Sequence, residues 1–320
     1  MRTDSAKTLL ADLARFPRSP LVVFTGGDPL KRPDVFELLD HSRAMGLLTA
    51  MTPSATPLVT RDAVFRFKQA GLDRLAISLD AADAATHDAF RRVRGSFART
   101  LDILRDAADA GLPAQINTTV TRHNLDQLDR IADVLAGLQI CLWSVFFLVP
   151  TGRATDDQRL TADEVERVFE TLYRQARRQP YPIKSTEAPH YRRYVVQQNT
   201  QHRRTRSGVA QIPPFAQIGT NDGKGVAFVS HTGEIYPSGF LPVRCGCFPE
   251  DSIVDVYQRH PLFVSLRDAT QLQGKCGACE YREICGGSRA RAHAVHGHPL
   301  AEEPDCAYTP ARSATSPNAT

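Results

Sequence analysis

Residues Leu21–Pro29 read LVVFTGGDP, a short apolar run that ends in two glycines and an aspartate. Pro20 and Gly26 bound the run, and its β-branched residues are typical of a strand buried on both faces. Strands of this kind belong to parallel sheets, in which ligands bind beyond the carboxyl ends of the strands. The stretch therefore predicts a strand over Leu21–Thr25 in a parallel α/β sheet, with a ligand-binding edge.

Similar runs recur along the first half of the chain, separated by segments with helical spacing or helix caps. They predict strands over Leu47–Met51, Arg74–Leu79, Pro113–Val120 and Leu142–Leu148. Strands that alternate with helices at a spacing of roughly 25–35 residues indicate βαβ units. The region is too short for a complete eight-stranded barrel, which needs about 250 residues. We expect a partial (β/α) TIM-like barrel that lacks its first strand, or an open doubly wound sheet.

Polar residues stand at or near the ends of most of these strands. The candidates are Gly26, Gly27 and Asp28 after the first strand, Ser78 and Asp80 after the third, and Asn117 and Thr119 in the fourth. Glycines let a backbone approach a ligand, and carboxylates and hydroxyls accept hydrogen bonds from ammonium or ribose groups. Each motif alone is also an ordinary turn or helix cap. Their recurrence at one edge of the sheet predicts a ligand-binding site there.

Residues 275–306 read KCGACEYREICGGSRARAHAVHGHPLAEEPDC and hold four of the seven cysteines, Cys276, Cys279, Cys285 and Cys306. So dense a cluster, in a chain without secretory features, is more often a metal site than a disulfide framework. Four thiolates close a tetrahedral zinc site or one [4Fe–4S] cube equally well, so both remain open. We expect nearby cations to lower the thiolate pKa values. These cations are Lys275, Arg282, Arg289 and Arg291.

Length and charge exclude several functional classes. A chain of 320 residues with 42% apolar content can bury one large core and a smaller one. Its net charge of +4, with mixed signs throughout, gives no argument for nucleic acid. The N-terminus lacks the apolar core of a signal peptide, and the longest apolar run, Cys141–Pro150, is too short for a bilayer span of about 20 residues. We expect a cytoplasmic protein with no membrane or nucleic-acid partner.

The second half of the chain changes character after Pro150. Thr161 and Glu164 form a capping box that opens an amphipathic helix. The basic stretch His190–Arg206 is interpreted as a solvated linker or mobile loop, in preference to an anion-binding segment. Gly225–Tyr236 predicts a β-hairpin. The expected boundaries are a partial barrel over 1–155, a helical and basic connecting region over 156–224, a small Cys-rich α+β domain over 225–308 and a disordered tail over 309–320.

These motifs together resemble a known family. GGDP after one strand, AISLD and INTTV in two others, and a downstream C-x2-C-x5-C…C are similar to radical S-adenosylmethionine (SAM) enzymes with a C-terminal SPASM- or twitch-type auxiliary iron–sulfur domain. The stretches HTGEIYPSGFLP and CGACEYREICGGSRARA resemble the branch that includes haem-synthesis and peptide-maturation enzymes. The resemblance covers about Ser5–Tyr308, and it favours iron–sulfur over zinc.

The resemblance implies two sets of cofactor-binding residues. For SAM, it implies that Gly26, Gly27 and Asp28 bind the amino group, that Ser78 and Asp80 lie beside the ribose and carboxylate, and that Asn117 and Thr119 lie on the strand opposite. The family more often has Glu where Asp28 stands. For one auxiliary [4Fe–4S] cluster, it implies the ligands Cys276, Cys279, Cys285 and Cys306. A second auxiliary cluster is not expected, because Ser238 and Ser288 stand where related proteins have ligands. Cys245 and Cys247 are expected to be free thiols.

One part of the family pattern is missing. The family holds its SAM-cleaving cluster with a C-x3-C-x2-C motif after the first barrel strand, whereas no cysteine here precedes Cys141. We expect that the sequence lacks this strand and loop, that the chain as given does not cleave SAM, and that the reading frame continues upstream of Met1.

The resemblance and the missing C-x3-C-x2-C motif leave three candidate functions. The first is a radical SAM oxidoreductase or maturase, in its intact form, that abstracts hydrogen from a peptide or tetrapyrrole-like substrate. An electron donor such as ferredoxin or flavodoxin would serve it. The second is a catalytically inactive homologue that binds a substrate or partner through its iron–sulfur module. The third is a zinc-binding structural protein.

Overall fold

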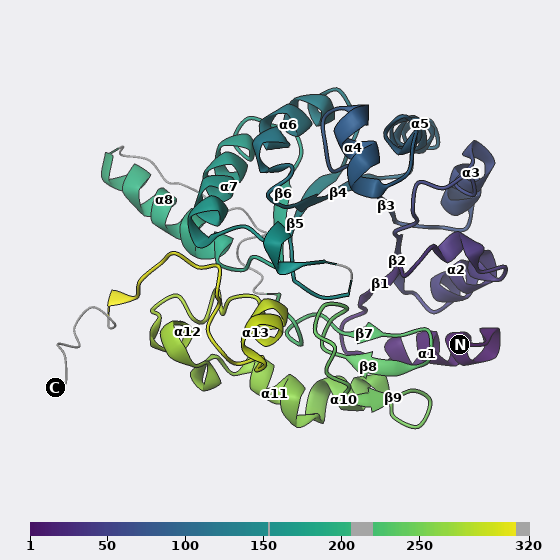
Figure 1. Ribbon diagram of the computed structural model, residues 1–320. Helices are drawn as coiled ribbons and strands as arrows, with labels where there is room; N and C mark the ends of the chain where they lie inside the picture. Colours follow the sequence, from purple (N-terminus) through teal and green to yellow (C-terminus); the bar gives the residue numbers. More distant parts are fainter. Residues whose placement is uncertain (153, 206–219, 312–320) are drawn as a thin grey trace. The chain divides into compact units, whose positions relative to one another are not determined.

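The computed structural model describes residues 1–152, 154–205 and 220–311, without the side chains of 202–205 (Figure 1). It divides into two compact units. The first comprises Met1–Val145, Gln175–Lys184 and Ser252–Val254, and the second comprises the described parts of Phe146–Arg174, Ser185–Asp251 and Asp255–Thr320. The boundary passes through two strands of one sheet, so each unit is described by itself.

A six-stranded sheet has its strands side by side in sequence order. The strands are β1 (Leu21–Phe24), β2 (Leu48–Met51), β3 (Arg74–Ser78), β4 (Ala114–Val120), β5 (Leu142–Phe147) and β6 (Ile183–Thr186). The β1–β2, β2–β3 and β3–β4 pairs are parallel. The five predicted strands and the partial (β/α) barrel are confirmed. The sixth strand escaped prediction because its sequence, IKST, has no apolar run.

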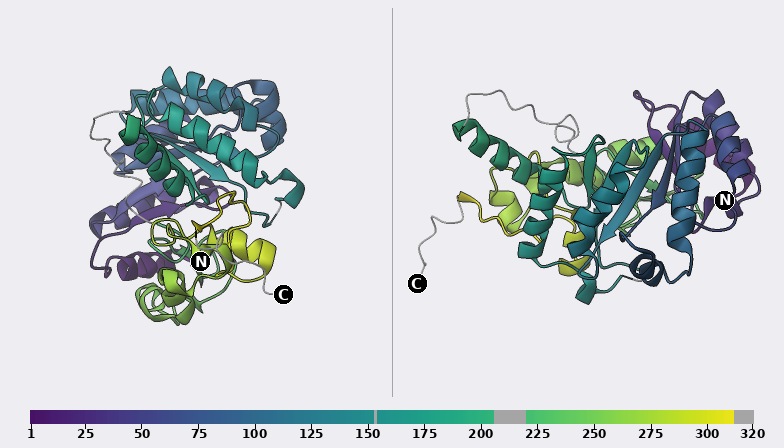
Figure 2. Two further views of the ribbon diagram at one scale, coloured as in Figure 1. Left: turned by 90° about the vertical axis from the view of Figure 1, so that its left-hand side faces the viewer. Right: turned by 90° about the horizontal axis from the view of Figure 1, so that it is seen from above.

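Helices of the first unit cover one face of this sheet (Figures 1 and 2, purple to blue). They are α1 (Thr3–Leu13), α2 (Val35–Ala44), α3 (Arg61–Gln69), α4 (Ala84–Arg91), α5 (Ser96–Asp109) and α6 (Leu128–Ala136), with short 3-10 turns η1 (Pro29–Lys31) and η2 (Leu125–Gln127). Leu10 of α1 and Leu38 of α2 belong to a core cluster against which Val22 and Phe24 of β1 pack. The apolar face of each helix is thus removed from water against the strands.

Strand β4 shows how the two faces of the sheet differ. Ala114, Ile116 and Thr118 are buried, whereas the alternate residues Gln115, Asn117 and Thr119 are only half-buried. Because successive side chains of a strand point to opposite faces, β4 turns one apolar side to the helices and one polar side to the other face. This polar face is the feature of the first unit that bears on ligand binding.

The second unit contains short strands and helices around the cysteines. Its elements are η3 (Asp156–Gln158), α7 (Ala162–Gln175), α8 (Tyr191–Thr205), β7 (Phe228–Val229), β8 (Glu234–Tyr236), β9 (Gly246–Cys247), α10 (Ile253–Arg259), α11 (Pro261–Arg267), η4 (Ala269–Gln271), α12 (Gly274–Ala278) and α13 (Arg289–His296). Antiparallel pairing of β7 with β8 confirms the predicted hairpin. Reciprocal hydrogen bonds between Thr161 and Glu164 confirm the capping box of α7.

The interpretation of His190–Arg206 as a solvated linker is wrong for its described part, while Arg206 lies outside the described residues. Tyr191–Thr205 forms helix α8, and Tyr191, Arg193 and Val195 are buried. Arg193 forms an ion pair with Glu166 of α7. The many cations of the stretch concealed its buried face, because a basic composition describes the solvated side of a helix as well as it describes a loop.

No helix within the described ranges is long and apolar enough to cross a membrane. The expected disordered tail falls mostly outside these ranges, which stop at Ala311.

Candidate functional site

The four clustered cysteines of the second unit line one pocket. Cys276, Cys279, Cys285 and Cys306 surround an empty volume of about 370 Å³, part of which opens to solvent. Cys276 is on the single turn of α12, and Cys279 follows directly after it. The remaining pocket residues are His190, Arg193, Lys275, Tyr281, Arg282, Gly286, Glu303, Tyr308 and Pro310. The structure therefore brings together all four residues that the sequence singled out as metal ligands.

Polar hydrogens of the surrounding chain point at the cysteine sulfurs. The Gly287 amide donates to Cys285 Sγ at 3.4 Å, and the Glu303 amide donates to Cys276 Sγ at 3.2 Å. Gly287 has a φ of 64°, and a Cβ there would lie 2.7 Å from the Glu303 Cβ and 3.5 Å from Cys276 Sγ. Only glycine fits this close approach without strain. Amide donors of this kind are what a sulfur-ligated metal centre uses to orient and tune its ligands.

A single metal ion and an iron–sulfur cube require different spacings of four thiolates. In the part of the chain that the structure describes, no three His, Cys, Asp or Glu side chains lie close enough to hold one metal ion. A zinc ion draws its four ligands together at Zn–S distances of about 2.3 Å. An iron–sulfur cube has one iron at each corner that takes a thiolate, and so holds the sulfurs farther apart. Either occupant requires the thiolates to share one pocket, as these four cysteines do.

Burial, rather than nearby positive charge, dominates the titration of these thiols. Removal from water raises the pKa of Cys276, Cys279 and Cys285, and it raises the pKa of Cys306 to about 11. The expectation that cations lower these values is therefore wrong in its net direction, although Arg289 does lower the pKa of Cys276 against the larger effect of burial. A metal that binds here must displace thiol protons.

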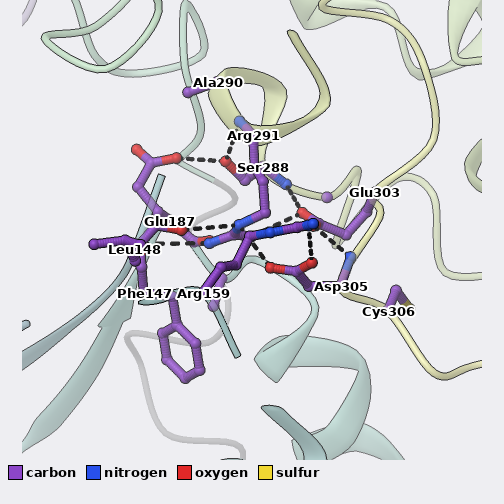
Figure 3. A network of polar contacts seen from close by, with 12 residues as sticks. Phe147, Leu148, Arg159, Glu187, Ser288, Ala290, Arg291, Glu303, Asp305 and Cys306 are labelled. Atoms are coloured by element: carbon purple, nitrogen blue, oxygen red, sulfur yellow. Dashed lines mark hydrogen bonds and ion pairs between the residues drawn. The ribbon is translucent and has the colours of Figure 1, made fainter. Parts of the chain in front are cut away.

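Arg291 is buried in an ion network with Glu303 and Asp305 (Figure 3). Its side chain is 1% exposed and donates to both carboxylate oxygens of Glu303, at 3.1 and 3.2 Å, and it pairs with Asp305 at 3.0 Å. It also donates to the Leu148 carbonyl at 3.1 Å and the Glu187 carbonyl at 2.8 Å. Glu303 and Asp305 lie within three residues of Cys306, so Arg291 fixes the segment of that cysteine to the end of β5.

Two further carboxylates lie beside the start of α13. Glu187 Oε2 accepts a hydrogen bond from the Ser288 hydroxyl at 2.5 Å, and Asp222 Oδ2 accepts one from the Ala290 amide at 2.9 Å. Burial and the negative charge of Asp222 raise the pKa of Glu187 to about 8, against the opposing effect of the Ser288 hydroxyl and Arg291. Burial also raises the pKa of Asp222. The carboxyl of Glu187 therefore favours its protonated form near neutral pH.

The glycine loop expected to bind SAM follows β1 in the first unit. Gly26 has a φ of 127°, and a Cβ added at either glycine would meet no atom within 4 Å. Asp28 is nearly buried, and both its carboxylate oxygens are occupied, by the Leu30 amide at 3.1 Å and the Thr56 hydroxyl at 2.7 Å. The two glycines thus leave open space for a ligand, whereas Asp28 holds the loop in place.

Strands β3 and β4 carry the other expected SAM residues. Ser78 lies opposite Asn117 in the parallel register, and both are half-buried, as is Thr119. Asp80 is fully buried, and its carboxylate accepts from Arg91 Nε and from the Thr119 amide at 2.8 Å. The structure therefore groups Ser78, Asn117 and Thr119 on the polar face, while Asp80 ties β3 to β4. The SAM contacts of all these residues remain predictions.

The remaining cysteines lie outside the four-cysteine pocket. Cys245 is buried and Cys247 is half-buried in β9, and neither lines the pocket. Ser238 is buried, and Ser288 caps α13 by accepting from the Arg291 amide at 3.1 Å. Ser288 therefore has a structural role as the cap of α13.

His190 and Arg193 are among the pocket residues that sequence reasoning missed. Both come from the start of α8, the segment interpreted as a linker, and both are buried. The tyrosines and valines of HYRRYVV recur at helical spacing. This pattern could have indicated a helix with one buried side.

Comparison with known proteins identifies relatives along almost the whole chain. The family model for the radical SAM superfamily matches residues 1–135. The AdoMet-dependent heme synthase of Nitratidesulfovibrio vulgaris is 39% identical over 317 residues, which cover 97% of this chain and 84% of that protein. The protein of the same name from Methanosarcina barkeri is 36% identical over 312 residues, covering 98% and 89%.

Among solved structures, SuiB of Streptococcus suis bound to the precursor peptide SuiA has the same fold. It matches with a TM-score of 0.72 and 18% identity, over 96% of this chain and 70% of that chain. At this identity the likeness concerns the fold alone.

Proposed function

The chain belongs to the radical SAM superfamily, and from this premise we propose that the protein, in an intact form that holds the SAM-cleaving cluster, modifies an iron tetrapyrrole in a SAM-dependent radical reaction. The observation that carries the proposal is the identity of 36–39% with two AdoMet-dependent heme synthases over nearly the full chain. A peptide substrate is the second candidate, favoured by the shared fold with a structure that holds a precursor peptide. We rank it lower because that likeness rests on 18% identity.

We propose that Cys276, Cys279, Cys285 and Cys306 hold one auxiliary [4Fe–4S] cluster. Support comes from their common pocket and from the Gly287 and Glu303 amides that donate to two of the sulfurs. When bound, such a cluster supplies a one-electron redox centre or a positioning group near the substrate. The residues of this chain contribute the thiols, the hydrogen bonds to their sulfurs, and the buried Arg291 network that holds the segment of Cys306. Zinc remains the competing occupant, and iron analysis separates the two.

For SAM, we propose a division of roles among the expected residues. The open space above Gly26 and Gly27 and the half-buried Ser78, Asn117 and Thr119 favour direct contact with the ligand. Asp28 and Asp80 would act as positioning residues, because their carboxylate oxygens already accept hydrogen bonds from the protein. When bound, SAM and its cluster supply a radical that abstracts hydrogen, with electrons from a donor such as ferredoxin or flavodoxin.

The 320-residue sequence contains no C-x3-C-x2-C motif, so we propose that this chain by itself binds the auxiliary cluster without cleaving SAM. A binding module of this kind is the alternative to the enzyme.

The test has two measurements on anaerobically reconstituted protein. The first titrates ferric haem and follows the shift of its Soret absorption band, with a short unstructured peptide as the comparison ligand. Binding of the iron porphyrin is expected, and binding of neither ligand would contradict the proposed substrate class. The second measures 5′-deoxyadenosine after addition of SAM and dithionite. Its formation by this chain would overturn the proposal that the chain itself does not cleave SAM.

A further inference from the structure

His190 is a buried histidine whose ring has no hydrogen-bond partner. It immediately precedes α8, it is 0% exposed, and both Nδ1 and Nε2 lack a partner among the described residues. The ring is held in place by an edge-on contact with Phe169, at a centroid distance of 4.8 Å. A buried polar group without a hydrogen bond costs about 1–3 kcal/mol, so such a group calls for an explanation.

The same pocket contains a second orphan donor, one helical turn farther along. Arg193 is 4% exposed, and its two Nη atoms are engaged by Glu166 and Gln197. Its Nε, however, has no partner. His190 and Arg193 are three residues apart and therefore lie on the same side of the helix start. Both line the pocket that the four cysteines line.

In its protonation state near neutral pH, the His190 ring can donate a hydrogen bond. Burial lowers the pKa of His190 to about 3, and the cations Arg291, Arg193 and Lys275 lower it further against the opposing charge of Glu303. The ring is therefore neutral near pH 7 and carries one N–H group. With four cysteines already available in the pocket, a cube has its full set of ligands without the imidazole.

We infer that the His190 ring N–H donates a hydrogen bond to a sulfur of the iron–sulfur cluster held by the four cysteines, with Arg193 Nε as a second donor. This inference rests on the auxiliary cluster of the proposed function. A cluster ligated by four thiolates is an anion. Its sulfurs would accept the hydrogen bonds that the His190 ring and Arg193 Nε otherwise lack. Hydrogen bonds to the sulfurs of a cluster stabilise its reduced, more negative state and so raise its reduction potential. The start of α8 would thus set the potential of the auxiliary centre.

The inference is tested by the midpoint potential of the reconstituted cluster, followed by EPR in a redox titration. His190→Phe keeps an aromatic ring against Phe169 but removes the N–H, and we expect it to retain iron and shift the potential to a more negative value. His190→Gln restores an N–H and should recover part of the shift. Arg193→Lys keeps the charge beside Glu166 without an Nε–H, and a smaller negative shift is expected. His293→Phe, on α13 and not among the pocket residues, is the matched control and should leave the potential unchanged.

Pulsed ENDOR on the reduced wild-type protein gives an independent readout. An exchangeable proton coupled to the cluster, lost in D2O and absent from His190→Phe, is expected. An unchanged potential in His190→Phe, or loss of its iron, would overturn the inference, since iron loss would mean a ligand or structural role. If His190→Phe does not fold, the absence of a nitrogen coupling from 15N-histidine in the labelled wild-type protein overturns it, because His190 is the histidine among the pocket residues. Failure of the wild-type protein to bind iron would instead contradict the proposed function.

Discussion

The backbone amide of Glu303 donates a hydrogen bond to the Cys276 sulfur at 3.2 Å, while the carboxylate of the same residue pairs with Arg291. One residue thus connects the cysteine pocket to the buried ion network. Because the Arg291 guanidinium also donates to three backbone carbonyls, at Phe147, Leu148 and Glu187, the position of the sulfur depends on segments distant in the sequence.

The first prediction concerns the metal. Reconstituted wild-type protein should bind about four irons, and Cys279→Ala should lose most of the brown chromophore, because a cube without one thiolate exposes an iron. Iron and sulfide analysis with visible absorption measures this. Cys141→Ala is the control, since Cys141 belongs to the first unit and should leave the iron content intact. One tightly bound zinc and no iron would favour the zinc-binding structural protein.

The second prediction concerns the ion network. Arg291→Met should lower the free energy of unfolding by about 3–5 kcal/mol, because it leaves the buried carboxylate of Glu303 without its cation, whereas Asp305 still pairs with Arg159. Denaturant unfolding measures the change. Arg105→Met removes an arginine whose ion pair with Asp102 is exposed, with side chains 65% and 62% accessible, and it should cost less than about 1 kcal/mol. Equal losses for both variants would show that the buried network adds nothing.

The third prediction separates strain from ligand contact in the glycine loop. Gly26→Ala should destabilise the protein by roughly 1–3 kcal/mol, because alanine is strained at a φ of 127°. Gly27→Ala meets no neighbour and has no positive φ, so its stability should change by less than about 0.5 kcal/mol. If SAM approaches this backbone, Gly27→Ala should still weaken SAM binding in isothermal titration calorimetry. Unchanged binding in Gly27→Ala would remove Gly27 from the SAM site.

The fourth prediction concerns pH. The pKa of Glu187 is raised to about 8 in the folded protein, above the ordinary value of 4.5 that the unfolded chain has. Between these values the folded state holds a proton that the unfolded state has released, so this residue's contribution to stability is lost as pH rises from about 4.5 to 8. Glu187→Gln should flatten the fall in unfolding free energy across this window. Exposed Glu250→Gln is the control, and a slope that stays the same in both variants would contradict the shift.

The strands show what sequence pattern alone determines. Apolar β-branched runs predicted β1 to β5 within two residues at each end, because a strand buried in a parallel sheet needs side chains of this type along its own length. Strand β6 has no such run. Its place beside β5 depends on tertiary contacts with the rest of the sheet, which its own sequence does not reveal. The capping box of α7 and the β7–β8 hairpin were also predictable, since their hydrogen bonds join residues close in sequence.

The cysteine spacing likewise singled out the four residues of the pocket, because a metal site requires thiols that the chain can bring together over short loops. Tertiary structure decided the rest. The environment of a buried charge or imidazole depends on residues far away in the sequence. Arg291 binds a carbonyl 143 residues distant, and the ring of His190 lies against Phe169 in a pocket that Cys306 also lines. Burial reversed the expected direction of the thiol pKa shifts in the same way. Local pattern reports how a segment folds, whereas the electrostatic energy of a buried group is set by the neighbours that the whole fold supplies.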